Sequence, residues 1–403
     1  MANVDSPADL ALAVYERLAD SRSRLASRDA AVLADQVALT RIPAPTGDEA
    51  ERAAWVASRF RTIGLVDVRM DDAGNVVGRR PGRATAAPVA VCAHLDTVFP
   101  RSTELQVRHE AHRVVGPGIT DNSRGLAVML AIAEELGSDR APLDRPVDFV
   151  ATTGEEGTGD LRGAKHYFAT DRPPAAAVII DGAGDERIVH RALGSRRFRV
   201  VAEGPGGHSW SAFGVANAVH AMASAASAIA RLRLSSEPRV AVTVARIGGG
   251  LSINAIPGSS WMEIDVRSVS PGGLFDTERR IRAAVDGAIV EENARRTNDT
   301  PPLTVRIDVI GDRPSGETPL DHPLVSAAAR LTQCIGRRPD LTLASTDANV
   351  PISAGIPAIA IGAGGHGGDT HTPAEWYDNT SGYLGVARAL ALVATASALP
   401  SLD

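Results

Sequence analysis

The sequence has very few cysteines and does not open on an apolar segment. Cys92 and Cys334 are its only two cysteines, too few for the disulfide framework of a small secreted domain. Among the first 30 residues, Asp5, Asp9 and Glu16 interrupt the apolar positions, whereas a secretory signal peptide has a charged start followed by an apolar core. We therefore expect no structural disulfides and a cytoplasmic location.

The sequence also lacks long hydrophobic runs and an excess of positive charge. No stretch approaches the roughly 20 apolar residues that a membrane-spanning helix needs, so we expect no membrane partner. The formal net charge is -6, which argues against nucleic acid as the main partner. Hydrophobic residues make up 44% of the 403 residues, enough for a sizeable core and, at this length, for two domains.

The order of the expected elements indicates an α/β fold with a mostly parallel sheet. Short apolar runs alternate with helical patterns, which is typical of a parallel sheet covered by helices on both faces. Strands are expected at 66–70, 75–79, 89–93, 147–152, 176–180 and 356–361. Helices are expected at about 8–20, 28–40, 46–63, 123–137, 159–169, 322–335 and 380–397. The helix at 46–63 would start with a capping box formed by Thr46 and Glu49 and would end at Gly64.

The pattern changes near residue 193 and returns near residue 312. Between these points the sequence predicts four strands and two helices in β-α-β-β-α-β order, which describes a small α+β sandwich. We therefore expect one domain made of residues 1–192 and 312–403, with a second domain, residues 193–311, inserted into it.

Histidines and acidic residues collect at the ends of the expected strands and at the start of a helix. The set is His94, Asp96, Asp121, Glu155, Glu156, Asp181 and His371. His94 and Asp96 follow one strand, and two residues that far apart on an extended chain point to the same side. Each member also has an ordinary alternative: Asp121 could be a helix N-cap, Asp181 could close a turn with Gly182, and the others could be solvated polar residues.

The joint position of these residues favours a metal site. The carboxyl ends of parallel strands meet at one edge of a sheet, so we expect the side chains to converge there. Two histidines and several carboxylates suit zinc or a similar divalent ion, and cobalt or manganese could replace zinc. Without a metal the carboxylates would repel one another, whereas two ions that share a bridging carboxylate would balance the charge.

Six short motifs give the sequence a resemblance to a known enzyme family. They are His94-Leu-Asp-Thr97, Gly118-Ile-Thr-Asp-Asn122, Gly154-Glu-Glu-Gly157, Gly206-Gly-His-Ser209, Asn254-Ala-Ile-Pro257 and His371-Thr-Pro373. With these motifs the chain resembles the di-zinc peptidases and amidohydrolases that include peptidase T, carboxypeptidase G, the aminoacylases and succinyl-diaminopimelate desuccinylase. The resemblance covers nearly the whole chain, and it implies that the inserted domain serves as a lid and dimerisation domain.

The resemblance implies a role for each residue at the sheet edge. One metal ion would be held by His94, Asp121 and Asp181, and a second by Asp121, Glu156 and His371. Asp96 would contact His94 without binding the metal itself, and Glu155 would be the general base. Two positions depart from the pattern: Ser123 stands where many relatives have Lys, and Asp181 stands where some have Glu. Neither change removes a ligand, but both could alter substrate preference.

The resemblance also implies roles for three residues of the inserted domain. His208 would reach the site of the neighbouring subunit in a homodimer and steady the oxyanion. Asn254 and Arg267 would bind the carbonyl or carboxylate of the substrate.

The sequence thus predicts a di-metal hydrolase that cleaves a peptide bond of small peptides, as an exopeptidase, with metal-activated water. The segment Thr346-Asp-Ala-Asn349 resembles the peptidase T branch, which favours small peptides. One alternative is a deacylase of N-acyl amino acids. Another is a metal- or ligand-binding relative without catalysis, against which the intact Glu155 argues.

Overall fold

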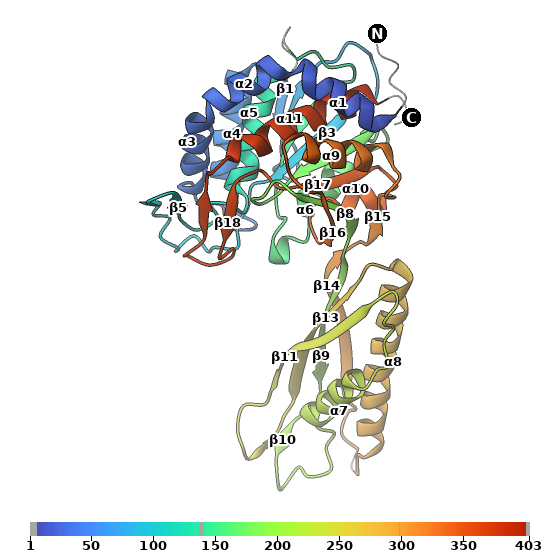
Figure 1. Cartoon of the computed structure of the whole chain (residues 1–403). Helices are drawn as coiled ribbons and strands as arrows, with labels where there is room; N and C mark the ends of the chain where they lie inside the picture. The colour runs from blue at the N-terminus through green and yellow to red at the C-terminus, as the bar shows by residue number, and fades with distance from the viewer. Residues whose placement is uncertain (1–5, 137–140, 298, 400–403) are drawn as a thin grey trace. The chain divides into compact units, whose positions relative to one another are not determined.

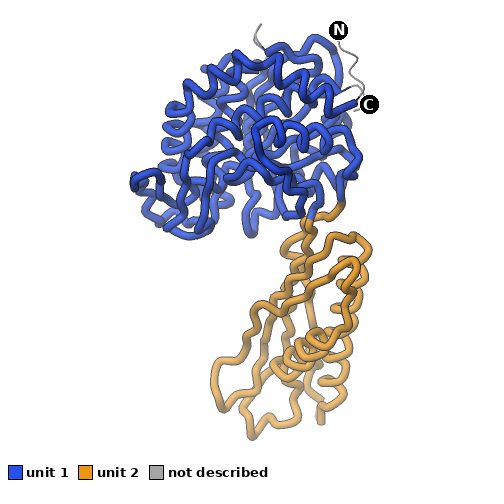
Figure 2. The backbone as a smooth tube through the Cα atoms, viewed as in Figure 1, with its two compact units in different colours: residues 1–192, 317–403 blue, residues 193–316 orange. Residues whose placement is uncertain are grey.

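A computed structural model of the chain describes residues 6–136, 141–297 and 299–399. It separates into two compact units, residues 1–192 with 317–403 and residues 193–316, which Figure 2 shows in blue and orange. We call them the large unit and the inserted unit. The first boundary falls at 192/193, where the sequence pattern changes. The second falls at 316/317 rather than at 311/312, because a strand of the inserted unit continues to Arg313.

The large unit is built on a nine-stranded sheet with a parallel centre (Figure 1). The spatial order is β1-β2-β6-β3-β7-β17-β8-β15, and β16 pairs with β8. The pairs β6–β3, β3–β7 and β7–β17 are parallel, whereas β1–β2, β2–β6 and β17–β8 are antiparallel. The strands are β1 (Val66–Met70), β2 (Val76–Arg80), β3 (Val89–His94), β6 (Val147–Thr152), β7 (Ala176–Ile180), β8 (Arg187–Ala192), β15 (Gly316–Glu317), β16 (Asp340–Ala344) and β17 (Ala358–Ile361). The predicted α/β class is confirmed.

Hydrophobic cores cover both faces of this sheet. Along β3, Val89, Val91 and Ala93 belong to one core, and Ala90 and Cys92 belong to the other, because side chains alternate between the two faces of a strand. The first core is completed by helices α1 (Pro7–Arg17), α2 (Ala19–Ser27), α3 (Asp29–Thr40), α4 (Ala50–Ile63), α5 (Ser123–Glu135), α9 (Pro323–Cys334) and α11 (Gly382–Ala398). The second core is completed by α6 (Arg162–Phe168) and α10 (Asn349–Ser353). Burial on both faces explains why the central strands are continuous apolar runs in the sequence.

The start of α4 differs from the sequence prediction. The predicted capping box is wrong: α4 begins at Ala50, its N-cap is Glu49, and no side chain caps it. The Thr46 hydroxyl instead donates to Asp96 Oδ2 at 2.8 Å, and Glu49 Oε1 accepts the N–H of Gly47 at 2.8 Å. Both side chains therefore bind groups outside the helix. The helix ends as predicted at Gly64, which adopts the left-handed conformation with φ 81°.

The inserted unit is an α+β sandwich with two helices on one face of a four-stranded antiparallel sheet (Figure 1). Its main elements are β9 (Gly194–Glu203), α7 (Ala218–Ala230), β11 (Val240–Gly249), β13 (Ser259–Ser268), α8 (Pro271–Ala294) and β14 (Thr304–Arg313), in the predicted chain order. The spatial order of the strands is β11-β13-β9-β14. A short ladder of β10 (Gly207–His208) and β12 (Ala255–Ile256) adds to them. It was not predicted from the sequence.

A second sheet of the large unit joins two distant segments of the chain. It consists of β4 (Arg108–Glu110), β5 (Arg113–Val115), β18 (His366–Gly368) and β19 (Trp376–Asp378), in the order β18-β19-β5-β4. The pairing of β19 with β5 brings the segment that ends at Asp121 next to the segment that carries His371. A 3-10 turn, η1 (Gly157–Gly159), follows the loop after β6. Within the three described ranges, no helix is long and apolar enough to cross a membrane.

Candidate metal centre

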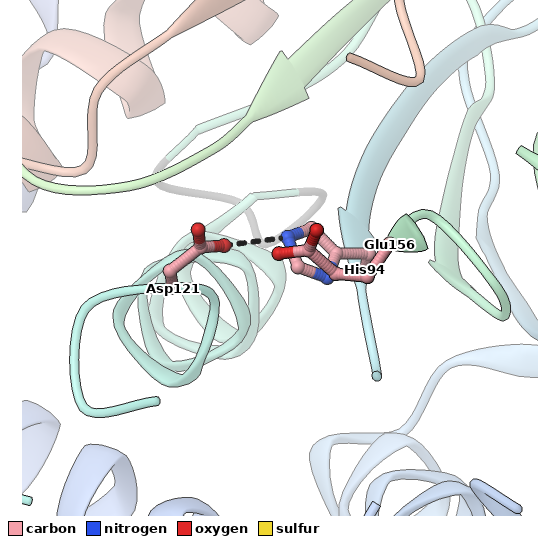
Figure 3. Close-up of side chains that lie close together, drawn as sticks. All are labelled: His94, Asp121 and Glu156. Carbon is pink, nitrogen blue, oxygen red and sulfur yellow. Dashed lines mark hydrogen bonds and ion pairs between the residues drawn. The ribbon is translucent and has the colours of Figure 1, made fainter. Parts of the chain in front are cut away.

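Three predicted ligands lie together at the carboxyl end of the large sheet. His94 is the last residue of β3, Asp121 lies just before α5, and Glu156 lies in the loop after β6. One ligand atom from each lies within 4.8 Å of the others. Figure 3 shows their side chains pointing toward one another, with His94 Nε2 2.8 Å from Asp121 Oδ1.

His371 and Asp181 complete the predicted ligand set. His371 Nε2 lies 3.2 Å from Asp121 Oδ2 and 2.9 Å from Glu156 Oε1. Asp181 follows the end of β7, and its Oδ1 lies 3.8 Å from His94 Nε2. The carboxylate of Asp121 therefore lies between two imidazoles, with one oxygen toward each. His371 has a φ of 67°, an uncommon backbone conformation of the kind that clusters at functional sites.

Asp96 holds both His94 and the loop after β6. Its side chain is fully buried, and its two oxygens accept the N–H groups of Glu155 and Glu156, each at 2.9 Å. His94 Nδ1 lies 3.0 Å from the backbone oxygen of Asp96 and 3.5 Å from its Oδ1. This contact leaves Nε2 of His94 facing the other candidate ligands, an orientation that metal-binding histidines share.

The carboxylates of the cluster favour the positively charged form of its two histidines. Burial lowers the pKa of His94, but hydrogen bonds to Asp121, Asp181 and Asp96 outweigh it and raise the pKa well above that of a free imidazole. The hydrogen bond to Asp121 is the main cause that raises the pKa of His371 to about 9. Burial, together with the charge of Asp121, raises the pKa of Glu156.

This donor set fits a divalent cation. Three carboxylates and two imidazoles supply only nitrogen and oxygen ligands, which zinc, cobalt and manganese all accept. The neighbouring carboxylates raise the pKa of both imidazoles and so favour a positive charge at this position. A bound divalent ion would supply that charge instead, and both histidines would then be neutral ligands.

Three buried acidic residues at this edge were not assigned to the site from the sequence. Glu49 accepts the N–H of Gly154 at 3.0 Å and pairs with Arg162 at 3.3 Å. Glu375 is fully buried against the segment before Asp121. Asp347 is also buried and accepts the Thr152 hydroxyl. From the sequence, Glu49 was interpreted as part of a helix cap and the segment with Asp347 as a mark of the peptidase T branch. For Glu375, its position four residues after His371 was the feature that could have indicated a role at the site.

The three predicted residues of the inserted unit lie at two ends of its sheet. His208 and Asn254 are exposed neighbours, joined by the β10–β12 ladder and by the Ser209 N–H, which donates to the Asn254 carbonyl at 2.9 Å. Arg267 lies near the far end of β13 and donates to Asp265 Oδ2 at 2.7 Å. Arg267 lies eight positions after Ser259, which is the first residue of β13, and this length of strand spans about 26 Å. Arg267 and the loop that carries Asn254 therefore lie toward opposite ends of β13.

Comparisons with known proteins agree with this architecture. The model of Peptidase family M20/M25/M40 matches residues 90–396. A succinyl-diaminopimelate desuccinylase of Corynebacterium glutamicum is 25% identical over 370 residues, which are 88% of this chain and 96% of that protein.

Solved structures show the same fold. The aminopeptidase PepT of Bacillus cereus superposes with a TM-score of 0.73 at 22% identity, over 92% of this chain and 99% of that one. A dinuclear metal-binding peptidase of the M20 family from Bacillus subtilis superposes with a TM-score of 0.67 at 16% identity, over 91% and 98% of the two chains. The family match spans most of the chain, including the inserted unit. The chain therefore belongs to Peptidase family M20/M25/M40, a family of hydrolases that act on peptide and amide bonds.

Proposed function

We propose that the protein is a di-metal exopeptidase that cleaves one peptide bond of small peptides. The observation that carries this proposal is the cluster of His94, Asp121 and Glu156, which His371 and Asp181 extend and beside which Glu155 lies buried. The likeness in fold to the aminopeptidase PepT supports the choice of peptides.

The five clustered side chains would hold the two ions. One would be held by His94, Asp121 and Asp181, and the other by Asp121, Glu156 and His371. When bound, these ions would activate a water molecule and polarise the scissile carbonyl. Zinc is the proposed metal, and cobalt and manganese fit the same donors.

Glu155 would move the proton. In this proposal its carboxylate accepts a proton from the attacking water and delivers it to the leaving nitrogen. The bond between its N–H and Asp96 supports this role, because it fixes the backbone of the residue relative to His94. A base that is held in the reactive geometry gives a higher rate than a mobile base, which is misaligned more often.

A homodimer would complete the site. His208 would donate to the developing oxyanion in the partner's site, with Asn254 beside it, while Arg267 would bind a substrate carboxylate. Four apolar side chains near His208 and Asn254 are at least 83% exposed, namely Trp210, Phe213, Leu251 and Ile253. Exposed apolar side chains gathered in two adjoining loops are typical of a surface that another molecule covers, and this supports a second copy as the partner.

Deacylation of an N-acyl amino acid is the second candidate. The similarity to a desuccinylase over 96% of that protein favours it. Both reactions cleave an amide C–N bond and would use the same residues. A cytoplasmic location is part of either proposal, and both cysteines, Cys92 and Cys334, are free.

The test is hydrolysis of a substrate panel by metal-loaded and by chelated protein. The panel holds dipeptides and tripeptides together with N-acetyl and N-succinyl amino acids. Metal-dependent cleavage of peptides supports the first candidate, and analysis of the products shows which terminus is attacked. Cleavage of acyl amino acids alone supports the second candidate, the deacylase, instead. Equal activity with and without a chelator contradicts both.

A further inference from the structure

Glu375 is a fully buried carboxylate outside the candidate ligand set. Its Oε1 accepts the N–H of Thr120 at 2.7 Å and the N–H of Asp121 at 2.9 Å, and the Thr120 hydroxyl donates to the same oxygen. Its Oε2 accepts the N–H of Gly118 at 3.1 Å. One side chain thus receives four hydrogen bonds from the segment that ends at Asp121.

The backbone of Glu375 is attached to the same segment. The N–H of Gly116 donates to the Glu375 carbonyl at 2.8 Å, and the next residue, Trp376, pairs with Val115 in the β19–β5 ladder. In addition, Gln36 Nε2 donates to the Ile119 carbonyl at 2.7 Å. The segment 116–121 is therefore held against Glu375 along its length.

The segment packs closely against Thr97 at Gly118. Gly118 has a φ of 73°, and a Cβ built there would lie 2.8 Å from Thr97 Cγ2. Burying a carboxylate such as that of Glu375 costs free energy unless its oxygens accept hydrogen bonds. The Glu375 carboxylate accepts four hydrogen bonds, which meet that requirement. All four donors belong to the 116–121 segment.

Glu375 also connects two candidate ligands. It lies four residues after His371, in the segment between β18 and β19. The ligand groups at the two ends of this connection touch, since His371 Nε2 lies 3.2 Å from Asp121 Oδ2. The carboxylate of Glu375 is thus a short link between two chain segments 250 residues apart.

We propose that Glu375 is a positioning residue that locks the Asp121 segment to the His371 segment, so that both ligands present one preformed site to the metal ions. This inference rests on the proposed function, in that divalent ions bind the cluster. In this proposal Glu375 is not itself a ligand and acts through the backbone of Asp121. Outer partners of this kind alter metal affinity by about 10- to 100-fold when they are replaced.

The experiment measures metal binding rather than turnover. Glu375→Gln keeps the size of the side chain but places an amide NH₂ against backbone N–H donors. Thr120→Val removes one donor and leaves the carboxylate in place. The matched control is Glu292→Gln, which replaces another buried glutamate that accepts a backbone N–H, from Asn217 at 2.9 Å, in the inserted unit.

Zn²⁺ affinity is measured by competition with a chromophoric chelator, and Co²⁺-loaded protein is compared by its visible absorption spectrum. We expect Glu375→Gln to weaken the binding of at least one ion by about 10- to 100-fold and to change the Co²⁺ spectrum. Thr120→Val should act in the same direction but less strongly, and Glu292→Gln should leave both readouts at the wild-type values.

A Glu375→Gln variant with wild-type affinity and spectrum would overturn the inference, as would an equal loss in the control. If circular dichroism shows that Glu375→Gln does not fold, wild-type affinity in Thr120→Val alone overturns it. Wild-type protein that binds no divalent ion would refute the proposed function and this inference together, an outcome distinct from the failure of Glu375→Gln alone.

Discussion

Glu49 and Gly154 are 105 residues apart in the chain, and the Glu49 side chain accepts the Gly154 N–H at 3.0 Å. The same Oε1 accepts the N–H of Gly47, and Arg162 balances the charge from 3.3 Å. Gly154 lies in the loop after β6 that carries Glu155 and Glu156, and Asp96 accepts the next two N–H groups of that loop. Two buried carboxylates therefore hold three consecutive N–H groups of the loop that bears the proposed base.

This relationship predicts that Glu49→Ala lowers kcat by about 10- to 100-fold, with a smaller change in KM, because a misplaced catalytic group slows the chemical step more than it weakens binding. Steady-state kinetics on the best substrate of the panel measure both constants. Glu51→Ala is the matched control, since Glu51 lies two residues after Glu49, in the first turn of α4, with its side chain 59% exposed. A wild-type kcat in Glu49→Ala would refute the role of Glu49 in positioning the loop.

Replacement of the proposed base tests the proton-transfer step. Glu155→Gln should reduce kcat by about 10²- to 10⁴-fold, the usual contribution of a general base. Metal content should remain at the wild-type level, because Glu155 is not one of the five proposed ligands. Elemental analysis of dialysed protein accompanies the kinetics. Unchanged turnover would rule out Glu155 as the base.

A mixture of two inactive variants tests the shared site. His208→Ala and Glu155→Gln should each lose activity, because His208 acts on the partner's site and Glu155 on its own. In a mixed dimer, one of the two sites would have both residues intact, so equal amounts should recover about a quarter of wild-type activity if subunits exchange freely. Size-exclusion chromatography checks the dimer. No recovery from a mixture shown to contain mixed dimers would contradict the assignment of His208.

The buried carboxyl of Asp347 predicts a pH-dependent stability. Burial is the main cause that raises the pKa of Asp347 to about 6, although the hydrogen bond from Thr152 opposes it. The folded protein thus binds this proton more tightly than the unfolded chain, in which an aspartate has a pKa of about 3.9. The contribution of Asp347 to stability is complete at low pH and is lost as the pH rises from about 4 through about 6.

Asp347→Asn removes this titration. In chelated protein we expect the variant to gain stability relative to wild type when the pH is raised from about 5 to about 7.5, by an amount on the order of 1–3 kcal/mol. Thermal denaturation at both pH values measures the difference. Asp340→Asn, at an exposed position of β16, controls for the loss of one charge. If the stability of the variant differs from that of the wild type by the same amount at both pH values, Asp347 does not titrate in this range.

Most of the fold could be predicted because its signals are local. The strands β3, β6 and β7 are fully buried, so each is a short apolar run that differs plainly from its neighbours. The same local character made α4 and its end at Gly64 recognisable. The short strands β4, β5, β10, β12, β18 and β19 were missed, since two or three residues carry no periodic pattern and their pairing depends on distant partners. The longer strands β8 and β16, of six and five residues, were not predicted either.

The candidate ligands could be named from the sequence for a similar reason. His94, Glu156 and Asp181 follow apolar strands, and the topology of a parallel sheet brings strand ends to one edge. The capping box at Thr46 and Glu49 failed because two residues with the right spacing found better partners elsewhere, Asp96 for one and Gly154 for the other. A spacing rule reports which contacts are available locally and not which distant groups compete for them.

The sequence by itself determined the class of the fold, the inserted domain and the identity of the clustered side chains, since hydrophobic periodicity and strand-end motifs are properties of neighbouring residues. Only the tertiary structure decided which groups support them. The bonds from Gly118, Thr120 and Asp121 to Glu375, and from Gly154 to Glu49, join segments more than 100 residues apart. Such contacts form because buried carboxylates must find donors, and the donors that reach them are set by how the whole sheet and its helices pack.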